Sequence, residues 1–271
     1  MNDIYARAAA DIVREAGLFL KHYSDGHRLN VEHKGSEFDF VTSADRESQA
    51  LIAGRLREAF PTHRFVGEED GLSDREIAGM IEAGGEDDWF WICDPLDGTA
   101  NYISHLGIYS VSVGLIHNGK SVAGAIALPE FGELFCAARG EGAFLNGRRI
   151  RASGCTELIH AFAAADIPVT DFELRRRFAD WMTGVCMTTA NTRMLGSACL
   201  ALAMTACGRL DAYWNVGLHP WDVAAGIVLV EEAGGVITDI FSEPFRFDMT
   251  GGILACAPGL ADAFRDIVRR P

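Results

Sequence analysis

The sequence predicts an α+β fold in two halves, an antiparallel-sheet half over residues 1–152 and an α/β half over residues 153–271. Two asparagine–glycine pairs, at 118–119 and 146–147, mark tight hairpin turns in the first half. From about Ser153 onward, strand-like and helix-like segments alternate, an order that is typical of α/β architecture. With 271 residues, 49% of them hydrophobic, the chain can bury a core as one large domain or two modest ones.

The first half begins with helices and continues with strands. Apolar residues at helical spacing predict an amphipathic helix over 3–23, and the polar stretch 24–37 that follows is expected to be mobile. A second helix is predicted over 43–60, because Pro61 lies just beyond it. The predicted strands are 89–93, which is apolar enough to be buried, and 111–116 with 121–126, which form a hairpin.

In the second half, four helical patterns are interleaved with strand-like runs. The helices are expected at 171–183, 197–207, 221–233 and 260–268. The strands are expected at 212–214, 235–238 and 253–256. The sequence contains no internal repeat and no low-complexity tract.

Composition excludes several classes of function. The formal net charge is −14, from 24 basic and 38 acidic residues, which disfavours nucleic acid as a partner. No apolar stretch approaches the length of a membrane span, and the first residues lack the pattern of a signal peptide. We therefore expect a soluble, cytoplasmic protein with no membrane partner.

The cysteines favour a reducing compartment. There are seven, an odd number, and no Cys-x-x-Cys pair occurs. A zinc site or a disulfide framework is the more specific interpretation. Several cysteines lie in apolar helical or strand patterns, however, so buried small hydrophobic residues are the expected role.

The segment 89–101 carries the most specific chemical signal. A buried strand leads into two carboxylates, Asp94 and Asp97, which repel each other unless a cation lies between them. A divalent metal is the obvious candidate, because hard cations take carboxylate and carbonyl oxygens, and the Leu96 carbonyl lies between the two. The backbone N–H groups of Gly98 and Thr99 would then open a short helix whose positive end attracts phosphate. Metal next to a phosphate site indicates phosphoryl chemistry.

Together with three other segments, this run resembles the inositol monophosphatase family of magnesium-dependent, lithium-sensitive phosphatases. The other segments are Asp39-Phe40-Val41-Thr42-Ser43-Ala44-Asp45, Gly67-Glu68-Glu69 and Trp221-Asp222-Val223-Ala224-Ala225-Gly226. All four occur in the family's order, and the resemblance covers nearly the whole chain. It implies an αβαβα layered sandwich with the active site in the cleft between the halves. It also implies a phosphoric monoester hydrolase that forms homodimers; the hydrophobic hairpins at 109–135 would supply an interface or belong to the core.

The resemblance assigns the reaction centre residue by residue. The implied ligands of two or three Mg²⁺ ions are Glu68, Asp94, the Leu96 carbonyl, Asp97 and Asp222. Glu68 and Thr99 would orient the attacking water, with Asp45 accepting the Thr99 hydroxyl proton. Gly98 and Thr99 would hold the phosphate through backbone donors. An equally weighted alternative is that Asp45 forms a capping box with Thr42.

The resemblance also places the substrate-binding residues. They are Asp97, Gly196, Ser197, Ala198 and Asn215, and Lys34 matches a lysine on a mobile loop near the metals. Ser197 is equally an N-cap, Lys34 equally a solvated lysine, and His219 is expected to pack or cap locally. Asn215 stands where inositol-specific enzymes commonly have glutamate. The expected substrate is inositol monophosphate. The alternatives are histidinol phosphate, a broad range of sugar or nucleotide phosphates, or a regulatory role without turnover.

Overall fold

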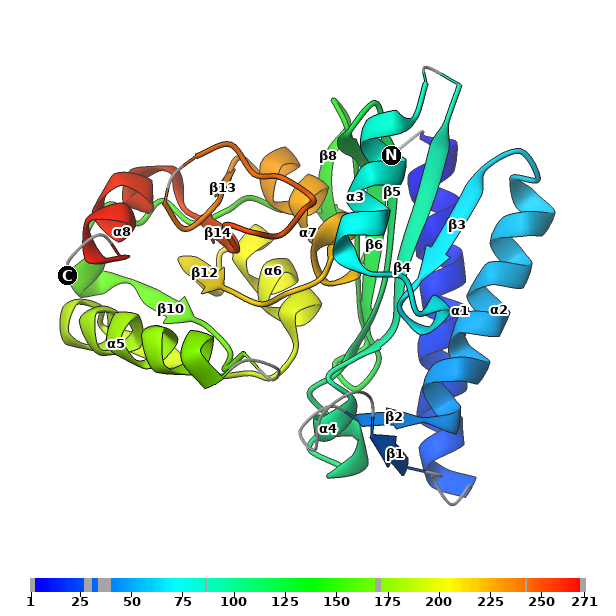
Figure 1. Ribbon diagram of the computed structural model, residues 1–271, viewed down its shortest axis with the longest axis horizontal. Helices are drawn as coiled ribbons and strands as arrows, with labels where there is room; N and C mark the ends of the chain where they lie inside the picture. Colours follow the sequence, from blue (N-terminus) through cyan, green and yellow to red (C-terminus); the bar gives the residue numbers. More distant parts are fainter. Residues whose placement is uncertain are drawn as a thin grey trace.

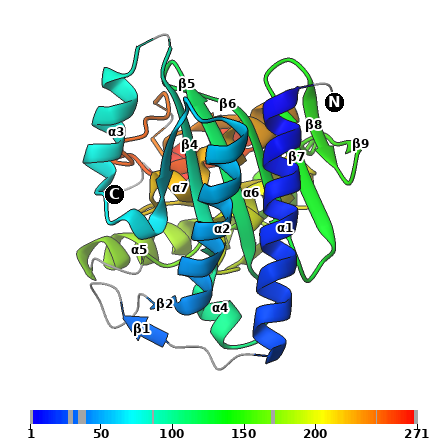
Figure 2. The same ribbon diagram turned by 90° about the vertical axis from the view of Figure 1, so that its right-hand side faces the viewer.

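The computed structural model describes residues 3–26, 31–33, 40–85, 87–168, 172–241 and 243–268. Two sheets and three helical layers alternate across the long axis of the molecule (Figure 1). Helices α1 (Ile4–Gly26) and α2 (Ser43–Ala59) cover the outer face of the larger sheet, as the turned view shows (Figure 2). Helices α6 (Ala198–Ala206) and α7 (Pro220–Glu232) lie between the sheets, and α5 (Phe172–Thr188) and α8 (Ala261–Val268) close the other side. The predicted αβαβα sandwich is confirmed.

The larger sheet has seven strands in the order β3-β4-β5-β6-β7-β8-β9. They are β3 (Arg64–Gly67), β4 (Trp89–Asp97), β5 (Ser110–His117), β6 (Lys120–Leu128), β7 (Glu133–Ala138), β8 (Gly142–Leu145) and β9 (Arg148–Arg149). All neighbours are antiparallel except β3 and β4, which are parallel. The predicted hairpin is confirmed, because β5 and β6 pair across Asn118 and Gly119, which both have the positive φ angles that favour such turns.

The smaller sheet has the order β11-β10-β12-β14-β13. Its strands are β10 (Phe162–Ala164), β11 (Asn191–Arg193), β12 (Ala212–Asn215), β13 (Val236–Thr238) and β14 (Ile253–Cys256). Strand β10 runs parallel to both β11 and β12, and the remaining pairs are antiparallel. The carboxyl ends of β10, β11 and β12 therefore meet at one edge of this sheet, where α/β proteins place ligands.

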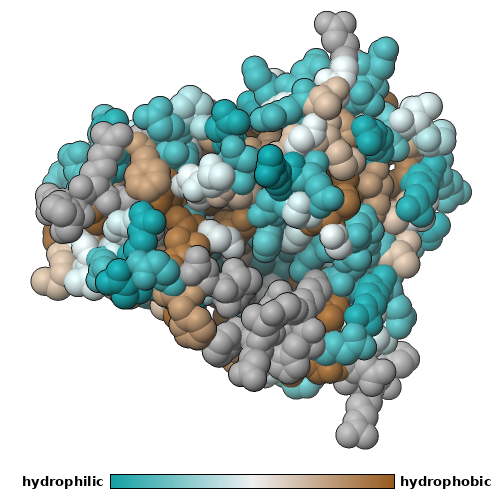
Figure 3. Space-filling model, in the orientation of Figure 1, coloured by the Kyte–Doolittle hydropathy of each residue, from teal (hydrophilic) through white to brown (hydrophobic). Residues whose placement is uncertain are grey.

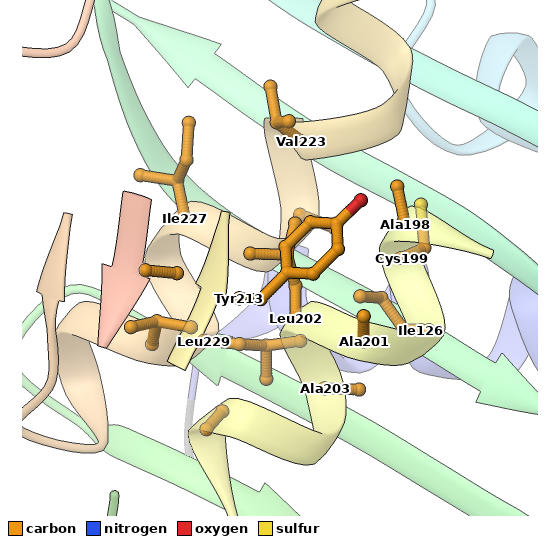
Figure 4. Close-up of a cluster of buried hydrophobic side chains, with 14 of the residues drawn as sticks. Ile126, Ala198, Cys199, Ala201, Leu202, Ala203, Tyr213, Val223, Ile227 and Leu229 are labelled. Atoms are coloured by element: carbon orange, nitrogen blue, oxygen red, sulfur yellow. The ribbon is translucent and has the colours of Figure 1, made fainter. Parts of the chain in front are cut away.

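The central helical layer joins the two sheets through apolar side chains. Helices α6 and α7 are hydrophobic on nearly all sides, which is typical of helices buried between two surfaces. Figure 4 shows the Tyr213 ring packed among aliphatic side chains of these helices, with its hydroxyl oxygen pointing away from Leu229. At Gly114 on β5, a Cβ atom would lie 2.6 Å from the backbone of α7 at Ala224, so only glycine allows this close approach. The fit holds α7, and with it Asp222, against the larger sheet.

Shorter elements complete the described fold. They are β1 (Val31–His33), β2 (Phe40–Thr42), α3 (Asp74–Ala83), α4 (Thr99–Ile103), and the 3₁₀ turns η1 (Glu68–Asp70), η2 (Leu158–His160) and η3 (Pro258–Leu260). Figure 1 shows α4 directly beyond the carboxyl end of β4. In the space-filling view, hydrophobic residues form scattered patches among mostly hydrophilic ones (Figure 3). Within the described parts of the chain, no helix is both long and apolar enough to cross a bilayer.

Several predicted boundaries need correction. The first helix continues to Gly26, so the polar stretch does not begin at residue 24; its expected mobility concerns residues that lie largely outside the described ones. The buried strand does not end at residue 93 but continues to Asp97, because β5 supplies a pairing partner up to that point. The helix predicted over 171–183 extends to Thr188. Strands β10 and β11 escaped prediction, because neither three-residue segment has the apolar β-branched residues that identified the equally short β13.

Candidate active site

The predicted site residues converge on one pocket of about 540 Å³ between the two sheets. From the first half it is lined by Glu68, Asp94, Leu96, Asp97, Gly98 and Thr99, and from the second by Gly196, Ser197, Ala198, Asn215 and Asp222. Asp45 lies behind this lining, where it contacts Thr99. Lys34 and Asp39 lie outside the described residues. The structure thus brings together residues that are up to 154 positions apart, from Glu68 to Asp222.

Strand β4 supplies the centre of the acidic cluster. Its pairing with β5 shifts register between Asp94 and Asp97, so both carboxylates face the pocket although they are an odd number of residues apart. Asp94 is 2% exposed and Asp97 is 7% exposed. The backbone N–H of Leu96 donates to Asp94 Oδ1 at 3.0 Å, which fixes that carboxylate within the turn.

Burial and mutual repulsion dominate the electrostatics of this cluster. Burial raises the pKa of Asp94 well above its usual value, and the neighbouring charge of Glu68 raises it further. Burial likewise raises the pKa of Asp222 to about 6, although the charge of His219 lowers it. Carboxylate oxygens from Asp94 and Asp97 lie within 4.8 Å of each other and of the Cys199 sulfur. Crowded, buried anions of this kind fit a bound divalent cation.

Asp97 accepts four hydrogen bonds, three of which come from the second half of the chain. Its Oδ2 accepts from the Ser110 hydroxyl at 2.8 Å, the Ser197 hydroxyl at 2.5 Å and the Cys199 backbone N–H at 2.9 Å. Its Oδ1 accepts from the Ala198 backbone N–H at 3.1 Å. The carboxylate thus receives the first N–H groups of α6, a favourable position for negative charge. Ser197 and Ala198, predicted as donors to the substrate, donate here to Asp97.

Asp45 makes the contacts that both of its predicted roles require. Its Oδ2 accepts from the backbone N–H and the hydroxyl of Thr42, at 2.8 and 2.6 Å, which forms the capping box at the start of α2. Its Oδ1 accepts from the Thr99 hydroxyl at 3.0 Å. The same hydroxyl lies 3.1 Å from the Leu96 carbonyl oxygen, so one proton is shared between two acceptors.

The start of α7 brings Asp222 to the pocket. The His219 backbone N–H donates to Asp222 Oδ2 at 2.7 Å, and Pro220 occupies the first turn, where no N–H is needed. The His219 ring stacks on Trp221 with centroids 4.6 Å apart, and its Nδ1 lies 2.8 Å from Asp74 Oδ1 on α3. Burial alone lowers the pKa of His219, but the Asp74 hydrogen bond and the Asp222 charge raise it to about 9. The predicted local packing is present, together with a contact between α3 and α7.

The side of the pocket opposite β4 is built by the smaller sheet. Asp166 follows β10, Gly196 follows β11 and Asn215 ends β12. The Gly196 backbone N–H donates to Asp166 Oδ1 at 2.6 Å. Asn215 is 2% exposed; its Nδ2 donates to the Tyr213 hydroxyl at 3.0 Å, and its Oδ1 accepts from the Val216 N–H at 2.8 Å.

Sequence reasoning missed two residues of this pocket region. Asp166 directly follows the small, apolar run 161–165, and a carboxylate at the end of a short buried strand is the signal that could have identified it. Cys199 was predicted only as a small hydrophobic residue. Burial and the neighbouring carboxylates raise the pKa of its thiol well above the usual value, so the sulfur stays protonated, and it donates to the Asp222 backbone oxygen at 3.1 Å.

A five-layered α/β chain with an acidic pocket between its two large sheets is the fold of solved inositol monophosphatase and SuhB structures. The chain belongs to the inositol monophosphatase family, because the family model matches residues 1–269. This membership supports phosphatase activity, metal binding and a small phosphate ester as substrate.

Individual relatives are similar over almost the full length. The chain is 36% identical to the Nus factor SuhB of Escherichia coli (strain K12) over 264 residues, which cover 97% of this chain and 93% of that protein. It is 37% identical to inositol monophosphatase 2 of Solanum lycopersicum over 268 residues, 96% of each chain. The crystal structure of the extragenic suppressor protein suhB from Bartonella henselae superimposes with a TM-score of 0.89, at 31% identity and 99% coverage of both chains. These relatives are therefore similar to this chain over almost their full length, although one is named a Nus factor and another an inositol monophosphatase.

Proposed function

We propose that this protein is a Mg²⁺-dependent phosphatase that hydrolyses a small phosphate monoester. The observation that carries the proposal is the convergence of Asp94, Asp97 and Asp222 from both halves on one pocket, next to Gly98 and Thr99. Three carboxylates at one place would be strongly unfavourable without a cation. A pocket that binds cations next to the backbone N–H donors of Gly98 and Thr99 is suited to a phosphate group.

The donor set suits magnesium. Glu68, Asp94, the Leu96 carbonyl, Asp97 and Asp222 would hold two or three ions, since all offer hard oxygen atoms and all line the pocket. Bound Mg²⁺ would neutralise the phosphate oxygens and provide a nucleophilic water at neutral pH. Cys199 is a neutral thiol and adds no charge to this set.

The chain's own residues would orient the reaction. The Thr99 hydroxyl donates a hydrogen bond to Asp45 Oδ1 or to the Leu96 carbonyl oxygen. The lone pairs of the hydroxyl oxygen are therefore available to accept a hydrogen bond from water. Glu68 would act with Thr99 to hold that water in place for attack. The backbone N–H groups of Gly98 and Thr99 would bind the phosphate. Gly98 has a φ of 95°, a conformation that suits glycine at this turn.

Inositol monophosphate is the leading substrate, with Asp97, Gly196, Ser197, Ala198 and Asn215 in contact with the alcohol. The relative from Solanum lycopersicum is named an inositol monophosphatase, which supports this choice. Histidinol phosphate and a broad range of sugar or nucleotide phosphates are the alternatives, because Asn215 brings no charge. Lithium inhibition, a homodimer, a cytoplasmic location and an approach of Lys34 to the metals complete the proposal.

The test is release of inorganic phosphate by the purified protein, with and without Mg²⁺, from a panel of phosphate monoesters. We expect turnover that requires Mg²⁺, is lost with chelator and falls with added lithium. A strong preference for histidinol phosphate would replace the leading substrate. Absence of turnover on every ester would favour the alternative of a regulatory protein that keeps the fold, a possibility prompted also by the name Nus factor of the Escherichia coli relative.

A further inference from the structure

Asp166 places a negative charge on the side of the pocket that the smaller sheet builds, opposite strand β4. It follows β10, the middle of the three neighbouring strands whose carboxyl ends meet at this edge of the smaller sheet. Gly196 and Asn215, from the two flanking strands, line the same pocket. A ligand that reaches this side of the pocket therefore meets groups from three strand ends.

Hydrogen bonds fix the orientation of this carboxylate. The Gly196 backbone N–H donates to Oδ1 at 2.6 Å. The Tyr213 hydroxyl lies 3.4 Å from Oδ2, a long contact, and its oxygen in turn accepts from Asn215 Nδ2 at 3.0 Å. Because Asn215 donates to Tyr213, the Tyr213 proton is directed toward Asp166. This series of hydrogen bonds, from Asn215 through the Tyr213 hydroxyl to Asp166, orients the carboxylate without neutralising its charge.

Neither lysine nor arginine occurs among the described residues that line the pocket, and the one histidine there, His219, is paired with Asp74 rather than with Asp166. Burial raises the pKa of Asp166, and the charge of Asp97 raises it further, although the backbone N–H of Gly196 lowers it. A half-buried carboxylate of this kind is stabilised when a ligand supplies positive charge. Its oxygens retain acceptor positions beyond those that Gly196 and Tyr213 occupy.

We propose that Asp166 selects phosphate monoesters whose alcohol carries a protonated amine over matched esters that carry a hydroxyl at the same position. This inference rests on the proposed phosphatase function, and it favours the alternative substrate histidinol phosphate, which carries an amine, over inositol monophosphate, which does not. An ammonium group forms a charge-assisted hydrogen bond with the carboxylate, whereas a neutral hydroxyl forms an ordinary one. Discrimination between alcohols arises from such pairing of polar groups in the pocket.

The experiment measures kcat/KM on two matched pairs. One is L-histidinol phosphate with its analogue in which a hydroxyl replaces the amine, and the other is glucosamine 1-phosphate with glucose 1-phosphate. We expect the native protein to prefer the amine by about tenfold or more in at least one pair. In Asp166→Asn the preference should fall to about twofold or less, while the neutral ester keeps its rate within about threefold. The asparagine oxygen can still accept from Gly196, so the loop after β11 keeps its anchor.

Two further variants separate charge from structure. Asp166→Glu restores the charge and should retain a preference for the amine even if overall rates fall. Asp180→Asn makes the same charge change on the exposed surface of α5 and should leave both members of each pair unaffected. The ratio within a pair is the decisive quantity, because a merely structural role of Asp166 would slow both members equally.

The possible results distinguish the two proposals. Turnover without amine preference in either pair, or a preference that survives in Asp166→Asn, overturns this inference and leaves the phosphatase assignment in place. An equal loss on both members of a pair also overturns it, since Asp166 would then only support the loop. Absence of turnover on all four esters and on inositol monophosphate overturns the phosphatase assignment and this inference with it.

Discussion

The two walls of the pocket are built in different ways. The wall formed by β4 carries Asp94 and Asp97 three residues apart on one strand, and both are almost completely buried. The opposite wall takes Asp166, Gly196 and Asn215 from three separate strand ends of the smaller sheet. A continuous, rigid strand suits groups that must hold fixed relative positions. Separate loops allow each contact to change independently, which suits the choice of substrate.

The contrast is also electrostatic. On the β4 wall burial raises the pKa of Asp94, and the charges of the neighbouring carboxylates Glu68 and Asp97 raise it further. On the opposite wall Asp166 faces neutral partners, the Tyr213 hydroxyl and the Gly196 backbone N–H. Metal binding would therefore neutralise the first wall, whereas the second keeps its charge for the substrate. Under the two proposals, metal binding would concentrate on the β4 wall, and the charge that selects an amine would lie on the opposite wall.

The strongest test of this contrast removes a charge from the β4 wall or from the start of α7. In Asp94→Asn or Asp222→Asn, we expect Mg²⁺-dependent turnover to fall by about a thousandfold or more, because each loses a proposed metal ligand. The fold should persist, since asparagine has nearly the same shape and relieves repulsion between buried charges. Phosphate release and circular dichroism measure the two properties. Full activity in either variant would refute the proposed metal site.

A second test separates the two roles of Asp45. Thr99→Ala removes the hydroxyl that Asp45 accepts and should lower kcat by roughly a hundredfold with little effect on stability. Thr42→Ala is the matched control, because it removes the helix cap but leaves the Thr99 contact. We expect it to lower the free energy of unfolding by about 1 kcal/mol and to change kcat much less. Equal activity losses in the two variants would mean that Thr99 matters only for structure.

A third test uses the pH dependence of stability. Without metal, the pKa of Asp222 rises from its usual 3.8 to about 6 on folding, so the folded state binds more protons between these values. The contribution of Asp222 to stability is therefore present at low pH and is lost as pH rises toward about 6. Mg²⁺ should reverse this trend, and it should raise the melting temperature more at pH 7.5 than at pH 5. A Mg²⁺ effect independent of pH would contradict a site that includes Asp222.

The smallest expected effect concerns the contact between His219 and Asp74. The pKa of His219 is raised from 6.5 to about 9 on folding, so its stabilising contribution is complete below pH 6.5 and is lost as pH rises through 9. Asp74→Asn should therefore lower the free energy of unfolding at pH 6 and have no effect at pH 10. The difference should be modest, because 40% of the His219 side chain is exposed. Urea denaturation at the two pH values measures it.

The β4 wall could be predicted from the sequence because its signal is local. A run of apolar residues followed by Asp94, Asp97 and Gly98 is visible without any tertiary information. Asp222 was found through its own short motif, and the structure places it in the same pocket. The hairpin at Asn118 was predicted from turn chemistry alone and is confirmed. In each case a few neighbouring residues determine the outcome.

On the opposite wall, Gly196 and Asn215 were predicted through the family resemblance, but Asp166 and the contacts of this wall were not, because those contacts form only in the folded chain. Asp166 and Gly196 are 30 residues apart in the sequence, and no local pattern links them. The donation of Ser197 to Asp97 spans 100 residues. Cys199 joins the acidic cluster only because α6 begins beside β4. Such contacts depend on how β10, β11 and β12 pair, and two of these strands are too short to leave a sequence pattern.

The four donors that meet on Asp97 have a consequence for how this chain could be recombined with its relatives. Two of them are backbone groups at the first turn of α6, and one is a serine hydroxyl from β5. A chimera that joins the N-terminal half of one homologue to the C-terminal half of another would have to preserve the spacing of both segments around this single carboxylate. Exchange at residue 152 therefore tests compatibility at Asp97 before it tests anything about substrate.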